Sequence, residues 1–307
     1  MRVEFVSCLI EEATEDETVC LLVGDLGFNV VEEFQNQFPR RFFNLGVSEQ
    51  SMMGVAAGLA SEGWRPFVYS IANFSSLRCI EQVRNDVAYE NREVCIVSIG
   101  AGLSYGLLGY THHGIEDLAC LRVLPNMRVF TPCDGREVSG IFKWNRDNPG
   151  PSYLRLGRGG EPDVHRSIPT LKSGEPILIR SGGSTTVLVT GSIASEVLVA
   201  TDLLADQGIE IPTVFSCPFS NLISKRFLHS LRNTDNLVIV EENRGAGGFF
   251  SFVLEQLSYE RINVRTFSLN LDHHDIKRVG SHDTLRRQSG IDSISIAEFL
   301  KKLQFSS

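Results

Sequence analysis

Short apolar segments recur between stretches of helical character, and this alternation constrains the fold more than any other feature of the chain. The first apolar segments lie at residues 19–23, 42–44, 66–69, 93–99 and 127–130. Helices are predicted around them at about 1–15, from 49 onward, at 74–90 and at 136–145. Strands this short and apolar, alternating with helices, are typical of a parallel sheet covered on both faces.

The alternation breaks once and then restarts. Gly and Pro interrupt it over residues 156–163, and a single strand is predicted at 176–180. Further strands follow at 186–190, 210–215, 236–240 and 263–267, with helices at 195–207 and 248–257. We therefore predict an α/β protein of two doubly wound, mostly parallel-sheet domains. The predicted boundaries are 1–160 for the first domain, 161–184 for a linker and 185–307 for the second domain.

The composition and charge of the chain argue against some classes of partner. With 307 residues, 42% of them hydrophobic and 21% charged, the chain is long enough for two separate cores. A net charge of −8 and the lack of a basic run argue against a nucleic-acid partner. No apolar stretch reaches the length of a membrane span or a signal peptide, so no membrane partner is expected. Seven scattered cysteines without a CxxC pair indicate reduced thiols and a cytoplasmic protein.

One carboxylate stands at the start of an unusual helix. Glu49 follows Ser48, a predicted N-cap, and precedes a run of small residues that includes Gly54 and Gly58. The plain interpretation is a buried helix with an acid in its first turn, where the helix dipole favours a negative charge. The small residues also allow a close approach to another backbone, including that of a second chain.

Further blocks follow Glu49 in a fixed order. They are Phe74-Ser-Ser-Leu-Arg78, Gly100-Ala-Gly102, Tyr110-Thr-His-His-Gly114, Leu124-Pro-Asn-Met127, Arg155-Leu-Gly-Arg158, Val240-Glu-Glu-Asn243 and Gly280-Ser-His-Asp283. In order and spacing the chain resembles the pyrimidine-binding domain and the C-terminal domain of transketolases and deoxyxylulose phosphate synthases. These enzymes depend on thiamine diphosphate, and the resemblance covers essentially the whole chain.

The resemblance implies a set of cofactor contacts. Glu49 takes the place of the acid that engages the N1′ nitrogen of the aminopyrimidine, so that the cofactor's own 4′-imino group can remove the thiazolium C2 proton. Phe74 matches the aromatic residue that stacks on the pyrimidine, and Tyr69 is a second candidate. Asp25, at the carboxyl end of the first strand, lies in the loop that approaches the cofactor in this family.

The resemblance also implies substrate contacts. His112 matches the histidine that faces the reacting carbon, and His113 is its neighbour. Arg158 matches the arginine that binds the sugar phosphate, and Arg155 precedes it by three residues, so either guanidinium could grip a phosphate or form an ion pair.

Two further substrate candidates are Arg78 and Asn29. Deoxyxylulose phosphate synthases carry an active-site arginine at the position of Arg78, and Asn29 shares the loop of Asp25. The adjacent pair His112 and His113 has no third ligand at a usual metal spacing, so no metal site is predicted on this chain.

Two departures from the family pattern matter. Many transketolases place an Asp that reads sugar hydroxyls where this chain has Leu108, which favours a deoxy, shorter or otherwise unusual sugar. The chain also lacks the Gly-Asp-Gly…Asn segment that holds Mg²⁺ and the diphosphate. Thiamine diphosphate is therefore expected to lie between two chains, with its diphosphate and Mg²⁺ held mainly by a separate N-terminal, diphosphate-binding transketolase subunit, in an α2β2 assembly.

The resemblance predicts the C-terminal section of a split transketolase, which transfers a two-carbon ketol unit from a ketose or ketose phosphate to an aldose. Two alternatives remain within the same cofactor class: the β subunit of a 2-oxoacid dehydrogenase E1 component and a deoxyxylulose-type decarboxylating synthase. A third alternative is a non-catalytic subunit that stabilises or regulates another transketolase.

Overall fold

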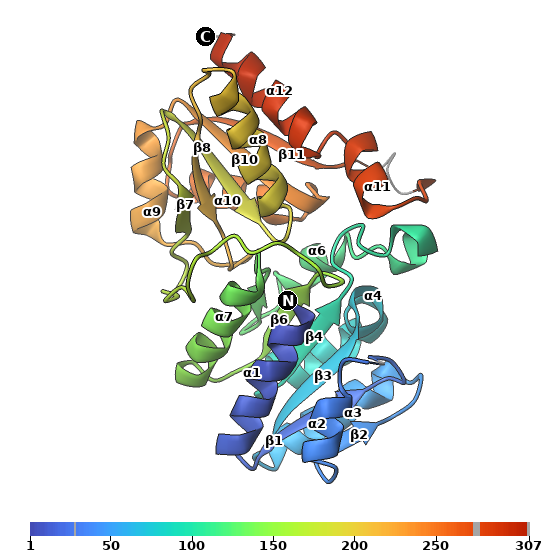
Figure 1. Cartoon of the computed structure of the whole chain (residues 1–307). Coiled ribbons are helices and arrows are strands. Elements are labelled where there is room, and N and C mark those ends of the chain that lie inside the picture. Colours follow the sequence, from blue (N-terminus) through green and yellow to red (C-terminus); the bar gives the residue numbers. More distant parts are fainter. Residues whose placement is uncertain (28, 273–276, 306–307) are drawn as a thin grey trace.

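The computed structural model describes residues 1–27, 29–272 and 277–305, which form two α/β units, each built on its own sheet (Figure 1). The first unit contains a six-stranded sheet in the order β2-β1-β3-β4-β6-β5. All of its strand pairs are parallel. Its strands are β1 (Val19–Val23), β2 (Phe42–Asn44), β3 (Arg65–Ile71), β4 (Cys95–Ile99), β5 (Arg128–Phe130) and β6 (Ser152–Leu156).

Helices cover both faces of the first sheet. One face packs against α1 (Arg2–Glu15), α2 (Glu32–Gln37) and α7 (Gly135–Asp147), and its core includes Phe5, Phe34 and Tyr69. The other face packs against α3 (Glu49–Ser61) and α6 (Asp117–Leu121), with Met52, Val68 and Leu118 in its core. The expected doubly wound, parallel architecture is confirmed.

The predicted helix at 74–90 is broken into short turns. The chain forms α4 (Ala72–Ser75), a 3₁₀ turn at Leu77–Cys79, α5 (Ile80–Gln82) and a π-helical stretch at Val83–Tyr89. The hydroxyls of Ser75 and Ser76 donate to the carbonyls of Ile71 and Ala72, a local bonding pattern that bends or ends helices. Short 3₁₀ turns at Gly106–Leu108 and Tyr110–His112 shape the loop after β4.

The second unit carries a five-stranded sheet in the order β11-β10-β8-β9-β7. Its strands are β7 (Ile177–Arg180), β8 (Thr185–Thr190), β9 (Thr213–Ser216), β10 (Asn236–Arg244) and β11 (Arg265–Leu271). Its helices are α8 (Ala194–Asp206), α9 (Lys225–Ser230), α10 (Phe249–Tyr259), α11 (His282–Gln288) and α12 (Ser293–Phe305), with a 3₁₀ turn at Leu231–Asn233. The edge strand β7, within the stretch expected as a linker, pairs antiparallel with β9.

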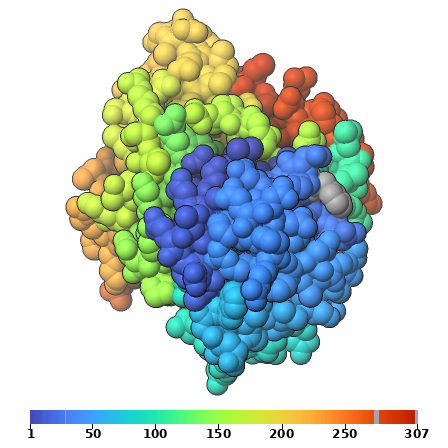
Figure 2. Space-filling view, turned by 60° about the horizontal axis from the view of Figure 1, so that its bottom comes forward, coloured from blue at the N-terminus to red at the C-terminus, as the bar shows by residue number. Residues whose placement is uncertain are grey.

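The two units meet along the loop that follows β4. In Figure 1 the teal segment after β4 extends to the red α11, and the amide of Gly280 donates to the carbonyl of Gly106 at 3.3 Å. Figure 2 shows the molecule from the side of the first unit that faces away from the second unit, where the blue N-terminal segments form a continuous surface. Across the described residues, no helix combines the length and the apolar character that spanning a bilayer requires.

Candidate active site

The candidate site lies where three neighbouring strands of the first sheet end. Strand β1 runs into Gly24 and Asp25, β2 leads to the first residue of α3, and β3 leads into α4. The chain moves from β1 outward to β2 and then back past β1 to β3, so the strand order reverses at this point. Open parallel sheets bind ligands at the carboxyl ends of their strands at such a reversal.

Glu49 is a buried carboxylate at this edge of the sheet. It begins α3 and is only 2% exposed. Its Oε2 accepts a hydrogen bond from Arg78 Nη1 at 2.6 Å, and Oε1 accepts none from the described residues. Ser48 occupies the N-cap position, but its hydroxyl donates to the carbonyl of Leu45 at 2.8 Å and does not cap the helix. One oxygen of a buried acid is therefore left for another donor.

An aromatic face lies beside the carboxylate. The guanidinium carbon of Arg78 lies 4.2 Å from the centroid of the Phe74 ring. The His112 ring meets Phe74 edge-on, with centroids 5.4 Å apart and planes at 67°. The structure thus brings Glu49, Phe74, Arg78 and His112 together, although they come from three different segments of the chain.

The two histidines of the predicted pair differ in environment. His112 is half-buried, and its Nδ1 lies 2.9 Å from the hydroxyl of Thr111, which leaves Nε2 for a ligand. His113 is fully buried, and neither ring nitrogen has a hydrogen-bond partner among the described residues. Burial lowers the pKa of His113, so its ring is held neutral. His112 is the one of the pair that a substrate could reach.

Asn73 supports the histidine loop, a role that the sequence did not suggest. Its side-chain amide donates to the carbonyls of His113 at 2.8 Å and Thr111 at 3.3 Å. Because Asn73 directly precedes Phe74, the ring of Phe74 and the loop of His112 are positioned by the same turn. The only sequence signal was its position next to an expected site residue.

Asp25 and Asn29 lie exposed on the loop after β1. Both adopt positive φ, 55° and 62°, a conformation that Asp and Asn tolerate better than most residues. The amide of Asp25 donates to Asn44 Oδ1 at 3.0 Å, and Asn44 Nδ2 donates back to the Asp25 carboxylate at 3.3 Å. The loop is therefore tied to the end of β2, beside the start of the Glu49 helix.

Tyr69 does not lie on the same face of the sheet as Glu49, which corrects its expected role as a pyrimidine wall. It is 1% exposed, and its ring stacks on Phe5 with centroids 5.7 Å apart. Tyr69 packs on the α1 face of the sheet, whereas its neighbour Val68 faces the α3 side. Its side chain is therefore a core residue on the far side of the sheet from Glu49.

Arg155 is likewise unavailable to a substrate, which corrects a second expectation. Its side chain is 3% exposed, and its Nε donates to Asp117 Oδ2 at 2.8 Å. Its Nη2 donates to the carbonyls of Gly114 at 2.5 Å and Glu242 at 3.2 Å. The buried guanidinium links β6 to the histidine loop and to the second unit, so its function is structural.

Arg158, three residues further on, is exposed and lines a cleft between the two units. The cleft has a volume of about 720 Å³, and its walls include Leu108, Glu161 and the stretch Gly280–Asp283. Leu108 is 55% exposed on the same rim. A cation and an apolar side chain therefore line one open space, together with the acidic residues Glu161, Glu196 and Asp283.

Glu242 of the second unit reaches into the first. Its Oε1 accepts from the amide of Leu103 at 2.7 Å and lies 2.7 Å from His282 Nε2, while Oε2 accepts from Arg286 Nε at 2.6 Å. Gly102 adopts a φ of +64°, and a Cβ there would overlap this carboxylate. The sequence blocks 240–243 and 280–283 marked these residues without indicating that they brace the loop of His112.

Comparisons with known proteins agree with this architecture. Residues 1–161 match the family described as "Transketolase, pyrimidine binding domain", and residues 174–296 match "Transketolase, C-terminal domain". The chain is 30% identical over 306 residues to a subunit of the apulose-4-phosphate transketolase of Phocaeicola vulgatus, covering 98% of this chain and 97% of the relative. It is 34% identical over 261 residues to a 6-deoxy-6-sulfo-D-fructose transketolase subunit of a Clostridium species, covering 84% and 80%.

A solved structure agrees as well. It is described as a split gene transketolase, inactive beta4 tetramer, and superimposes on this chain with a TM-score of 0.85 at 30% identity. The match covers 97% of this chain and 96% of that chain.

Proposed function

Because the chain belongs to the transketolase family, we propose that it is the pyrimidine-side subunit of a two-chain transketolase. In complex with a separate diphosphate-binding subunit, it transfers a two-carbon ketol unit from a ketose or ketose phosphate to an aldose acceptor. The observation that carries this proposal is the buried carboxylate of Glu49, one oxygen of which is unpaired among the described residues, beside the ring of Phe74.

These residues fit the aminopyrimidine end of thiamine diphosphate. A planar, nitrogen-rich cation, the guanidinium of Arg78, already bridges the carboxylate of Glu49 and the face of Phe74. When bound, the cofactor would supply a nucleophilic carbon that adds to the ketose carbonyl. Glu49 would hold a proton at N1′, and Phe74 would orient the ring and exclude water from it.

Other residues of the chain would act on the sugar. His112, fixed through Nδ1 by Thr111 and edge-on to Phe74, would present Nε2 to a sugar oxygen and move a proton there. Arg158 would bind an anionic end of the substrate from the cleft wall. Arg78, Asp25 and Asn29 would line the entrance, and His113 would shape the loop beneath His112 without touching substrate.

The diphosphate and Mg²⁺ would be bound by the partner. Among the described residues, the one group of three potential metal ligands lies elsewhere, at Cys133, Glu137 and His165. The two relatives reported above are themselves named as transketolase subunits, which supports a separate partner chain. We propose an α2β2 complex in which two copies of this chain pack around each other.

The substrate is proposed to be a sugar with a terminal anion. The relatives are named for a sugar phosphate and for a sulfo sugar, both of which carry an acidic group. Leu108 cannot hydrogen-bond hydroxyls, so a deoxy or short-chain sugar fits the rim better than a fully hydroxylated one.

The test is reconstitution with a diphosphate-domain subunit. Thiamine diphosphate and Mg²⁺ are titrated by calorimetry into this chain alone, into the partner alone and into the mixture, and ketol transfer is then assayed. We expect binding and transfer in the mixture only. Glu49→Gln should lower kcat by about 10²–10⁴-fold, the usual contribution of a positioned acid or base.

Glu62→Gln is the matched control, because Glu62 is an exposed acid at the other end of the same helix. Tight cofactor binding by this chain alone would contradict the division of the site between two chains. Decarboxylation of pyruvate by the mixture, without ketol transfer, would favour the 2-oxoacid dehydrogenase or deoxyxylulose-type alternative. Failure of the mixture to bind cofactor would favour a non-catalytic subunit.

A further inference from the structure

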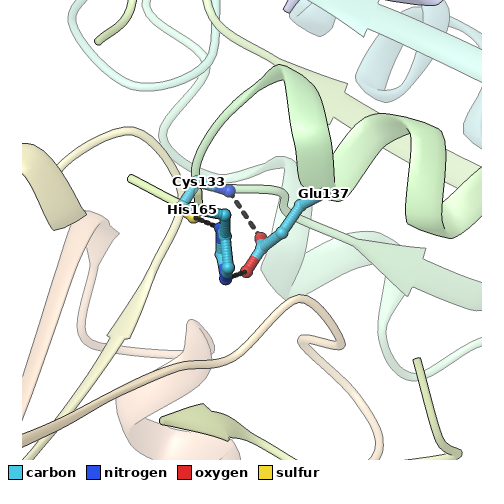
Figure 3. Close-up of side chains that lie close together, drawn as sticks. All are labelled: Cys133, Glu137 and His165. Carbon is cyan, nitrogen blue, oxygen red and sulfur yellow. Dashed lines mark hydrogen bonds and ion pairs between the residues drawn. The ribbon is translucent and has the colours of Figure 1, made fainter. Parts of the chain in front are cut away.

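A second cluster of reactive side chains lies away from Glu49, at the junction of β5, α7 and the segment that leaves β6. Cys133 follows β5, Glu137 lies in the first turn of α7, and His165 comes from the chain between β6 and β7 (Figure 3). Each offers one potential ligand atom, and these atoms all lie within 4.8 Å of one another. His165, which lies 32 positions after Cys133, thus meets the other two side chains in one small volume.

The cluster is buried, and part of it lacks hydrogen bonds. Cys133 is 1% exposed, Glu137 is 0% exposed, and the side chain of His165 is 9% exposed. Glu137 Oε1 and His165 Nε2 have no hydrogen-bond partner among the described residues, and these two atoms face each other at 3.5 Å. Leaving a buried acceptor unsatisfied is costly, so the arrangement calls for a bound group or a proton between them.

Neighbouring contacts orient each potential ligand. His165 Nδ1 lies 3.2 Å from Asp134 Oδ2, and this oxygen also accepts from the backbone amide of His165 at 2.7 Å. Glu137 Oε2 accepts from the amide of Cys133 at 2.7 Å, which turns Oε1 toward the histidine. Cys133 Sγ lies 3.6 Å from His165 Nδ1, and His165 Nε2 lies 3.5 Å from Glu137 Oε1, so the imidazole lies between the thiol and the carboxylate with one ring nitrogen toward each.

We propose that Cys133, Glu137 and His165 bind a zinc ion through the thiolate, a carboxylate oxygen and one imidazole nitrogen. A thiolate, an imidazole and a carboxylate form a set of ligands that suits Zn²⁺ and disfavours Mg²⁺. The thiol proton leaves to solvent as the metal binds, a water completes four-coordination, and the ion's two positive charges balance the thiolate and the carboxylate. The zinc would fasten the segment around His165 to the start of α7, independently of the cofactor site.

The test uses the full chain, stripped with a chelator and titrated with Co²⁺ as a spectroscopic probe and then with Zn²⁺. We expect one Co²⁺ per chain with a thiolate-to-cobalt charge-transfer band, which Zn²⁺ displaces. Cys133→Ser should remove the band, and Glu137→Gln and His165→Gln should each weaken binding by about 10-fold or more. Cys120→Ser is the matched control, because Cys120 is a partly exposed thiol outside the cluster.

A second readout does not depend on the variants folding equally well. Limited proteolysis of the wild-type chain should cleave the segment around His165 more slowly with Zn²⁺ than after chelation. The absence of a thiolate–cobalt band in the wild type would overturn the proposal, and so would its survival in Cys133→Ser. Either result would leave His165 as an imidazolium ion-paired with Asp134 and Glu137.

Discussion

The guanidinium of Arg78 lies between the carboxylate of Glu49 and the ring of Phe74, 2.6 Å from Oε2 through Nη1 and 4.2 Å from the ring centroid through Cζ. In the isolated chain it therefore occupies contacts that the proposed aminopyrimidine needs. Cofactor binding has to displace Arg78 from Phe74 and to share or replace its bond to Glu49.

Arg78→Ala is therefore expected to tighten cofactor binding in the assembled complex. Removal of the guanidinium abolishes a cation–π contact worth about 0.5–1 kcal/mol and leaves a buried carboxylate that the pyrimidine can pair with. We expect Kd for thiamine diphosphate to fall by about 2- to 5-fold, since 1.4 kcal/mol corresponds to a factor of ten. Arg84→Ala is the control, because exposed Arg84 bonds only its neighbour Asn85 within the part of the chain that the structure describes. An unchanged or weaker affinity of Arg78→Ala for thiamine diphosphate would contradict the prediction that Arg78 competes with the cofactor.

Leu108→Asp is expected to shift sugar preference. Leu108 lines the cleft beside Arg158, and a carboxylate there could accept from sugar hydroxyls. We expect the ratio of kcat/KM for hydroxylated over deoxy acceptors to rise by about 10-fold, the value of one good hydrogen bond. Leu107→Asp is the control, because Leu107 is the 70% exposed neighbour on the same turn. Equal effects of the two substitutions would mean that the rim responds to charge and not to position.

The substitutions Arg158→Ala and Arg155→Ala should have different effects, the first on substrate binding and the second on stability. Loss of exposed Arg158 should raise KM for a phosphorylated or sulfonated substrate and leave the urea midpoint of unfolding unchanged. Loss of buried Arg155 strands the Asp117 carboxylate, and breaking such a pair costs about 3–5 kcal/mol. Urea unfolding and steady-state kinetics on both variants separate the two roles. A kinetic defect in Arg155→Ala without a loss of stability would indicate that Arg155 contacts the substrate.

Two adjacent acids on β10 should give opposite pH dependences. Burial raises the pKa of Glu241 to about 7, so folded protein holds a proton that the unfolded chain has released, and stability falls as pH rises from about 4.5 to 7. Burial opposes ionisation of Glu242 too, but the charges of Arg286 and His282 lower its pKa well below the usual value. The stability that Glu242 contributes is present above about pH 4.5 and is lost as the pH falls below it.

Urea unfolding at pH 5 and pH 7 checks this. Glu241→Gln should flatten the loss of stability between these two values, and Glu242→Gln should not. The change attributable to Glu241 is at most about 3 kcal/mol, since one pKa unit corresponds to about 1.4 kcal/mol. If Glu241→Gln leaves the change in stability between pH 5 and pH 7 unaltered, the carboxyl of Glu241 is ionised at neutral pH in the wild-type protein.

The strand–helix alternation predicted the fold class, and the blocks around Glu49, Phe74 and His112 predicted residues that lie together. Tyr69 could not be placed in the same way. It lies on β3, whose interior residues are all buried because both faces of the sheet are covered. Without polar–apolar alternation, the sequence does not indicate which face a side chain takes.

The predicted role of Arg155 in substrate binding was wrong for a related reason. A charged residue interrupts the apolar run of β6, so that strand was not anticipated although all five of its residues are buried. Its partner Asp117 lies 38 positions earlier, and a pairing over that distance leaves no local signal. Asn73 was missed because its contacts are with backbone carbonyls, which carry no sequence identity, and the bracing role of Glu242 was missed because its contacts come from residues distant in the sequence.

The carboxylate of Glu242 and the guanidinium of Arg155 cross the boundary between the two sheets in opposite directions, one holding the amide of Leu103 and the other the carbonyl of Glu242 itself. Unfolding of either unit alone would remove these backbone hydrogen bonds and expose both buried ions to solvent. The chain should consequently melt in one calorimetric transition. The position of His112 in the first unit therefore depends on the stability of the whole molecule. We expect destabilisation of the second unit to appear first as a lower catalytic rate.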